Sequence, residues 1–157
     1  MFVTLRLRMV DSQLRARGIE DERVLDAMGR VPRHEFTAGR YRDQAYEDYP
    51  LPIGEGQTIS QPYIVASMLE ALALTPADRV LEIGTGCGII SLCLAKQYPT
   101  VKITAIEIQE ELSRCARENV ALCGLGNRIR VVQGDARVLR KELPEHSFHR
   151  IGANPPC

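Results

Sequence analysis

Three glycines and two acidic residues stand where a ribose-containing cofactor could bind. The stretch LEIGTGCGII places Gly84, Gly86 and Gly88 directly after an apolar run, where missing side chains allow a tight turn and let a ligand lie against the backbone. Glu107 ends the next apolar run, about twenty residues later, where a carboxylate can accept both hydroxyls of a ribose. Asp135 ends a third run. We expect these residues at one edge of a sheet, because the carboxyl ends of parallel strands meet there.

The glycine stretch differs from two common phosphate-binding motifs. A dinucleotide fingerprint GxGxxG would need a third glycine where Ile89 stands, and Gly88 comes one place too early. A phosphate loop would need Gly-Lys-Ser/Thr, which is absent. Taken separately, Glu107 and Asp135 could be ordinary solvent-facing caps of the helices that follow them. Their recurrence beside the glycines favours a cofactor site.

The segments that position these residues alternate between strand and helix. The pattern predicts strands over 79–83, 101–107, 129–133 and 148–153, helices over 88–97 and 110–122, and a short helical or irregular piece before the last strand. Strands separated by such helices indicate a parallel sheet with right-handed crossovers. The predicted fold class is therefore α/β, with a Rossmann-like, doubly wound parallel sheet.

The first part of the chain has a different pattern. Apolar residues between Asp11 and Met28 recur at near-helical spacing with Gly18 as a break, which predicts two short helices. Residues 31–62 have no sustained period and are too many for an ordinary connection, and such long loops tend to be functional. A helix is expected from Tyr63. We expect a single domain over 1–157, with N-terminal helices and a substrate loop in 1–62 and a cofactor-binding half-sheet in 63–157.

Composition narrows the classes of function. The chain has 157 residues, 45% hydrophobic and 25% charged, and its 20 basic residues balance 20 acidic ones, so no nucleic-acid partner is expected. No apolar run approaches the roughly 20 residues that span a bilayer, and the first ten residues have charges where a signal peptide would need its apolar core. We therefore expect a cytoplasmic protein without a membrane partner. The five cysteines form no CxxC pair, so no metal site is expected.

Residues 79–135 resemble the cofactor half of class I S-adenosylmethionine-dependent methyltransferases. EIGTGCG matches their glycine motif, AIEI their ribose-binding acid, and GDA the segment that meets the adenine. The resemblance implies S-adenosyl-L-methionine as cofactor, with Glu82 near its methionine amino group. The cofactor-binding residues that it implies are Glu82, Gly84, Thr85, Gly86, Gly88, Glu107, Ile108, Asp135 and Ala136.

Residues 9–86 resemble one subfamily, the protein-L-isoaspartate O-methyltransferases. The matching stretches are RGIEDERVLDAMGRVPRHEF, AYEDYPLPIGEGQTISQPYIVASM and RVLEIGTGCG. In that family a Thr-Ile-Ser segment lies over the transferable methyl group. The resemblance therefore implies Ser60 and Thr58 as catalytic residues, with Ile59 and Gln61 in the substrate site. The implied activity is methylation of the carboxylate of isoaspartyl residues in damaged proteins.

These residue types suit that chemistry. A carboxylate is already an anion at neutral pH, so its methylation needs alignment and charge placement rather than a strong base. From the residue types alone, the segment from Thr58 to Ser60 could equally cap the helix expected from Tyr63. The run from Tyr46 to Tyr49 could shape a substrate cleft, although a solvated loop is the favoured interpretation.

Residues 88–157 resemble a different group, the methyltransferases that modify exocyclic or amide nitrogens. Their signature is Asn-Pro-Pro followed by an aromatic residue, and here the chain reads Asn154-Pro155-Pro156-Cys157. The resemblance implies Asn154 as a substrate residue that accepts hydrogen bonds from a target amino group, although Cys157 supplies no aromatic ring. From the residues alone, Asn-Pro-Pro also favours a turn.

The resemblance to class I methyltransferases implies the order 3-2-1-4 for the roughly four strands that the pattern predicts, which accompany the predicted N-terminal helical layer. Further strands of the class I fold are not readable, so a truncated or chimeric chain is one interpretation. An exposed edge strand predicts a homo-oligomer, through edge pairing or exchange of elements. Three hypotheses remain open: an isoaspartyl O-methyltransferase, an adenine or glutamine N-methyltransferase that uses Asn154, and a catalytically silent domain.

Overall fold

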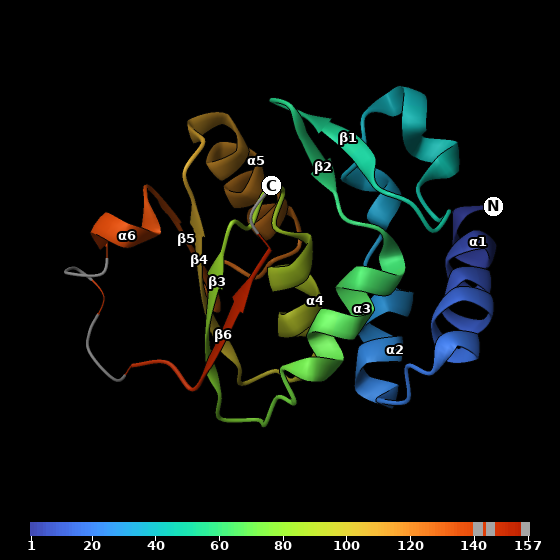
Figure 1. Cartoon of the computed structure of the whole chain (residues 1–157), viewed down its shortest axis with the longest axis horizontal. Helices are drawn as coiled ribbons and strands as arrows, with labels where there is room; N and C mark the ends of the chain where they lie inside the picture. The colour runs from blue at the N-terminus through green and yellow to red at the C-terminus, as the bar shows by residue number, and fades with distance from the viewer. Residues whose placement is uncertain (140–142, 144–146, 155–157) are drawn as a thin grey trace. The chain divides into compact units, whose positions relative to one another are not determined.

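The computed structural model describes residues 1–139, 143 and 147–154. The chain divides into two compact units, Met1–Ala73 (unit 1) and Leu74–Cys157 (unit 2). Figure 1 shows helices and a small hairpin in the first unit and a sheet with helices in the second. Helix α3 (Pro62–Ala71) belongs to unit 1.

Unit 1 begins with a helical layer. Gly18 has φ of 92° and separates two helical stretches, which confirms the predicted break. The first stretch begins earlier than the apolar periodicity indicates, at Phe2. The helical segments of this layer are α1 (Phe2–Met9), the π-helical turn η1 (Val10–Leu14), the 3₁₀ turn η2 (Arg15–Arg17), α2 (Glu22–Arg30), and the 3₁₀ turns η3 (Arg33–Glu35) and η4 (Gly39–Gln44).

The long segment predicted as a loop contains an antiparallel hairpin. Strand β1 (Leu51–Gly54) pairs with β2 (Gln57–Ile59), and Leu51 lies opposite Ile59. Both strands are too short for an alternation of apolar and polar residues to show in the sequence. The hairpin leads directly into α3, which begins with Pro62 at a position where proline is well tolerated.

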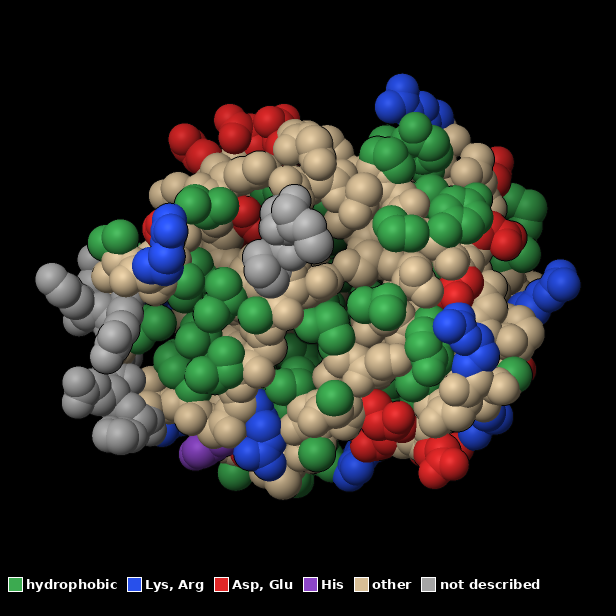
Figure 2. Space-filling model, in the orientation of Figure 1, with side chains coloured by type: hydrophobic (Ala, Val, Ile, Leu, Met, Phe, Trp, Pro, Cys, Tyr) green, Lys and Arg blue, Asp and Glu red, His purple; other side chains and the backbone are tan. Residues whose placement is uncertain are grey.

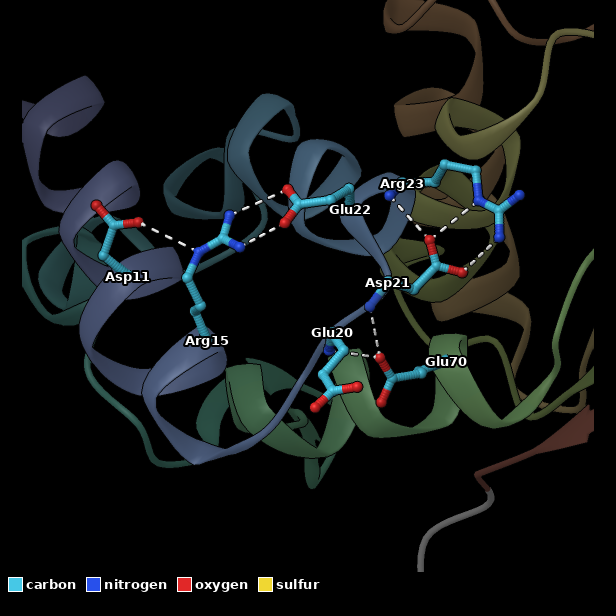
Figure 3. Close-up of polar contacts among 7 residues, drawn as sticks. All are labelled: Asp11, Arg15, Glu20, Asp21, Glu22, Arg23 and Glu70. Carbon is cyan, nitrogen blue, oxygen red and sulfur yellow. Dashed lines mark hydrogen bonds and ion pairs between the residues drawn. The ribbon is translucent and has the colours of Figure 1, made fainter.

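A carboxylate of α3 holds the start of α2 (Figure 3). One oxygen of Glu70 accepts hydrogen bonds from the backbone amides of Glu20 and Asp21, at 2.7 and 2.8 Å. Asp21 is the N-cap of α2 and accepts from the Arg23 amide at 2.9 Å. These bonds satisfy amides at a helix start that would otherwise lack partners. They fix α3 against the helical layer within unit 1.

Unit 2 contains a parallel sheet. Its strands lie in the order β5-β4-β3-β6, which is the predicted order 3-2-1-4 and confirms the α/β fold class. Each predicted strand is present within two residues of its expected bounds. The strands are β3 (Arg79–Ile83), β4 (Lys102–Glu107), β5 (Ile129–Gln133) and β6 (Arg150–Ala153).

Helices lie on both sides of the sheet (Figure 1). Leu81 and Ile106 pack with Leu139 of α6 (Ala136–Leu139) on one face. On the other face, Glu82 is bonded by a side chain of α4 (Ile89–Gln97), as expected because neighbouring residues of a strand point to opposite sides. Helix α5 (Glu110–Leu122) connects β4 to β5.

The surface of the molecule carries some exposed apolar side chains. Figure 2 shows apolar side chains gathered over part of the face in view. In unit 2 the exposed large apolar residues include Ile108, Val138 and Ile151. Across the described parts of the chain, none of the helices combines the length and the apolar character needed to cross a bilayer.

Candidate functional site

The glycine loop leaves β3 in a conformation that requires glycine. Gly84, Gly86 and Gly88 have φ angles of 76°, 57° and 89°, in the left-handed region that side chains disfavour. The amides of Gly84 and Thr85 both donate to the carbonyl of Ile106, at 2.9 and 3.1 Å. The loop is therefore tied to the end of β4 before α4 begins.

Glu107 sits at the tip of β4 and holds the same loop. It is 6% exposed, and its Oε2 accepts from the Gly86 amide at 2.9 Å while Oε1 accepts from the Gln109 amide at 3.0 Å. An ionised carboxylate offers about four lone-pair positions, so two hydrogen bonds leave capacity for further donors. The predicted neighbours Gly86 and Glu107 are thus in direct contact.

Glu82 is a buried acid beneath the loop. It is 2% exposed, and its Oε2 accepts from the Thr85 hydroxyl at 2.8 Å and from the Ser91 hydroxyl of α4. Its other oxygen, Oε1, is buried and has no hydrogen-bond partner among the residues that the structure describes. Burial raises the pKa of the Glu82 carboxyl, and the two hydroxyls oppose that rise. A cation brought to Oε1 would favour the ionised form.

Helix α5 supports the loop from a further direction. The Asn119 side-chain amide donates to the carbonyl of Cys87 at 2.8 Å. A side chain at Gly88 would meet Ala116 of the same helix at 3.6 Å, so helix and loop are closely packed. Together with the bonds to Glu82 and Glu107, these contacts fix the conformation of the loop.

Asp135 follows β5 and does serve as a helix cap. Its carboxylate accepts from the Arg137 amide at 2.9 Å and pairs with the Arg137 guanidinium, which lowers the pKa of Asp135 to about 2. The next residue, Ala136, begins α6. Capping α6 is compatible with a place in the cofactor site. The Gly134 backbone amide donates to the Glu107 carbonyl at 2.8 Å, which places the turn at Asp135 beside the tip of β4.

These features fit the cofactor that the sequence resemblance implies. Two ribose hydroxyls need acceptors, and Glu107 has acceptor capacity to spare. A methionine ammonium needs a buried acceptor, and Oε1 of Glu82 is one. An adenine ring needs an apolar surface, and Ile108, which is 57% exposed, follows Glu107 directly. The donor and acceptor types therefore agree with S-adenosylmethionine.

Asn154 lies at the end of β6 beside this edge. The backbone amide of Asn154 donates to the carbonyl of Ile83, the residue before the glycine loop, at 3.2 Å. The predicted unit 2 residues thus meet at the carboxyl ends of four neighbouring strands. Pro155, Pro156 and Cys157, which complete the predicted motif, lie outside the described residues.

The predicted substrate residues Thr58, Ile59, Ser60 and Gln61 lie together in unit 1, at the end of the hairpin. Thr58 is exposed, Ile59 is buried and Ser60 is half-buried. The N-cap of α3 is Gln61, and the amide of Tyr63 is bonded by Asp48 at 3.1 Å, so neither Thr58 nor Ser60 occupies the N-cap position.

The solvated-loop interpretation of residues 46–49 is wrong for two of them. Tyr46 is 4% exposed, and its hydroxyl lies 2.6 Å from Nδ1 of His34. Asp48 bonds the start of α3. These long-range contacts give no local signal in the sequence, and the same holds for Ser91 and Asn119, which the sequence interpretation also missed.

Comparison with known proteins agrees with this geometry. A family model described as protein-L-isoaspartate(D-aspartate) O-methyltransferase matches residues 6–147. A protein-L-isoaspartate O-methyltransferase of Methylorubrum populi is 53% identical over 131 residues, which cover 83% of this chain and 61% of that protein. One from Koribacter versatilis is 52% identical over 134 residues, 85% of this chain and 59% of that protein.

A solved structure shares the fold. It is a Plasmodium falciparum protein titled a putative protein-L-isoaspartate O-methyltransferase in complex with S-adenosyl-L-homocysteine, with a TM-score of 0.79 and 24% identity over 94% of this chain and 72% of that one. The chain spans about three fifths of the length of the curated relatives named above. The family match continues past Gly88, and the resemblance of residues 88–157 to amino-methyltransferases stays a prediction.

Proposed function

Because the chain belongs to the protein-L-isoaspartate(D-aspartate) O-methyltransferase family, we propose that it methylates the carboxylate of isoaspartyl residues in damaged proteins, with S-adenosylmethionine as methyl donor. The observation that carries the proposal is the match over residues 6–147, since it includes both the hairpin of unit 1 and the glycine loop of unit 2. The geometry of each unit supports it.

In unit 2, Glu107 binds the ribose hydroxyls and Glu82 binds the methionine ammonium. When bound, the cofactor supplies a methyl group activated by a sulfonium. Gly84 and Gly86 let the ligand approach the backbone, and Ile108 offers its apolar side chain to the adenine. The loop is already held in position, so little ordering accompanies binding.

In unit 1, Ser60 and Thr58 orient the acceptor carboxylate. The acceptor is an anion at neutral pH, so these hydroxyls position it and do not need to remove a proton. Ile59 and Gln61 complete the substrate segment, with Ile59 buried to 1% exposure and thereby fixing the end of β2. The substrate class is a protein or peptide that contains an isoaspartyl residue.

Methyl transfer by the Ser60→Ala variant tests the proposal. The unchanged chain should methylate an isoaspartyl peptide, and Ser60→Ala should lower kcat/KM by at least about tenfold, which corresponds to one lost hydrogen bond to a charged group. Ser12→Ala is the control, because Ser12 is an exposed serine whose hydroxyl donates to the Arg8 carbonyl of its own helical stretch. Equal activity of Ser60→Ala and Ser12→Ala would contradict the role of Ser60.

A second candidate is an N-methyltransferase that uses Asn154. The observation that favours it is the hydrogen bond from the Asn154 backbone amide to the Ile83 carbonyl, which places Asn154 next to the glycine loop. Methyl transfer to an adenine or a glutamine amide that is lost in Asn154→Ala would support this candidate. A folded chain that transfers a methyl group to no acceptor would indicate a silent domain.

We also propose self-association of this chain and a cytoplasmic location. Strand β6 pairs with β3 alone among the strands that the structure describes, and Ile151 of β6 is 62% exposed. An open edge of this kind can pair with another strand. Light scattering at micromolar concentration should show a dimer that Ile151→Lys weakens. Within the described part of the chain, Cys115 and Cys123 form no disulfide, as is usual in a reducing compartment.

A further inference from the structure

We propose that Asp48 is a positioning residue for the methyl acceptor, because it closes the base of the hairpin Leu51–Ile59 and so holds the Thr58–Ser60 segment in place. The inference rests on the proposed function for the identity of the acceptor. The closure of the hairpin itself rests on contacts within unit 1.

The hairpin has little stability of its own. Its strands have four and three residues, and the register shifts between Pro52 and Gly54. The turn contains Gly54, Glu55 and Gly56, all with positive φ, and all three are exposed. An isolated two-stranded hairpin is at best marginally stable in water. Contacts from outside the two strands must therefore fix the substrate segment.

Asp48 makes those contacts across both ends of the hairpin. It stands just before β1, and its Oδ1 accepts from the Tyr63 amide beyond β2 at 3.1 Å. The Gln61 side-chain amide lies 3.5 Å from Oδ2. The carboxylate also lies at the N-terminus of α3, where a negative charge is favourable. One side chain thus joins the chain entering the hairpin to the chain leaving it.

Arg17 completes this contact. Its guanidinium forms an ion pair with Asp48 and lies over the Tyr63 ring, 3.6 Å from the ring centre. Arg17 therefore bonds the carboxylate and packs on the residue whose amide that carboxylate holds. Such a cation–aromatic contact adds to the stability of the pair.

The residues before Asp48 are themselves fixed. The Arg33 guanidinium donates to the Ala45 carbonyl at 2.7 Å, and the side-chain amide of Gln13 donates to the Tyr46 carbonyl at 2.9 Å. Ala45 is fully buried and Tyr46 nearly so. Asp48 consequently extends from a rigid base, so its bonds to the far side of the hairpin can set the position of the substrate segment.

Three variants of the full chain test the proposal. Asp48→Ala removes the bonds to the Tyr63 amide and the Gln61 side chain and the ion pair with Arg17, whereas Asp48→Asn keeps an acceptor for the Tyr63 amide and loses the charge. Asp26→Ala is the matched control, because Asp26 pairs with Arg30 at 3.0 Å and both side chains are more than half exposed. The readouts are hydrogen exchange of the Tyr63 amide, KM for an isoaspartyl peptide, and the Kd of S-adenosylhomocysteine.

For Asp48→Ala we expect exchange of the Tyr63 amide and KM each to rise about tenfold, with the Kd for S-adenosylhomocysteine changed by less than about twofold. Asp48→Asn should lie between this variant and the unchanged chain, and Asp26→Ala should match the unchanged chain. The contrast between KM and Kd separates positioning from a general loss of stability.

Two results would overturn the proposal. One is unchanged exchange of the Tyr63 amide in Asp48→Ala, and the other is a Kd that rises as much as KM. If the unchanged chain methylates no peptide, the proposed function fails and the acceptor role of Asp48 fails with it. Hydrogen exchange then still decides whether Asp48 closes the hairpin.

Discussion

Replacing Ser91 with alanine should destabilise unit 2, whereas the same change at Ser113 should not. Both serines are fully buried, one in α4 and one in α5. The Ser91 hydroxyl donates to the buried carboxylate of Glu82. The Ser113 hydroxyl has no hydrogen-bond partner among the described residues. Comparing Ser91→Ala with Ser113→Ala therefore separates the loss of the bond to Glu82 from the general effect of removing a buried hydroxyl.

The magnitude follows from the type of bond. A hydrogen bond to a charged group contributes about 1.5–3 kcal/mol, so Ser91→Ala should lower the free energy of unfolding by that amount. This corresponds to a factor of about 10 to 150 in the unfolding equilibrium. Ser113→Ala removes an unsatisfied polar group and should be neutral or stabilising, by no more than about 1 kcal/mol.

Urea unfolding of the two variants measures the difference. Because the Glu82 carboxylate also binds the Thr85 hydroxyl, Ser91→Ala should weaken binding of S-adenosylhomocysteine as well, and Ser113→Ala should leave it unchanged. Free energies of unfolding for the two variants that agree within about 0.5 kcal/mol would refute this account of Glu82.

Three further changes have defined outcomes. Burial raises the pKa of the Glu82 carboxyl above its ordinary value of 4.5, so the folded state binds a proton there more tightly than the unfolded state. The protonated carboxyl therefore stabilises the fold at low pH, and this contribution is lost as pH rises through the folded pKa. Glu82→Gln should remove that decline, which begins above pH 4.5, in urea unfolding. Gly88→Ala should cost about 1–2 kcal/mol in thermal unfolding, because its φ is +89° although Ala116 leaves ordinary contact space. Glu107→Ala should weaken S-adenosylhomocysteine binding at least about tenfold by calorimetry, while Glu110→Ala, at an exposed position, should not.

The sheet and its cofactor edge could be predicted because their signals are local. Apolar runs mark β3, β4 and β5, and the glycines directly follow the first of them. Parallel strands then place Glu107 and Asp135 at one edge without any knowledge of packing. The short strand β6 was predicted near its observed bounds for the same reason.

The supports of the site could not be predicted, because they depend on contacts between distant residues. Ser91 is one polar residue in an apolar helix, and nothing in its spacing indicates a bond to Glu82. Asp48 stands in a run of charged and aromatic residues that resembles a solvated loop. Its partner Arg17 is 31 positions away. Periodicity and motifs report local conformation, whereas such bonds depend on how the elements pack.

The most direct test of the proposed function is methyl transfer from S-adenosylmethionine to two peptides that differ only in an isoaspartyl or an ordinary aspartyl linkage. The account predicts transfer to the isoaspartyl peptide alone, and a product that loses its methyl group in mild base, as a carboxyl ester does. Equal transfer to both peptides, a base-stable methyl group, or no transfer by a folded chain would contradict it.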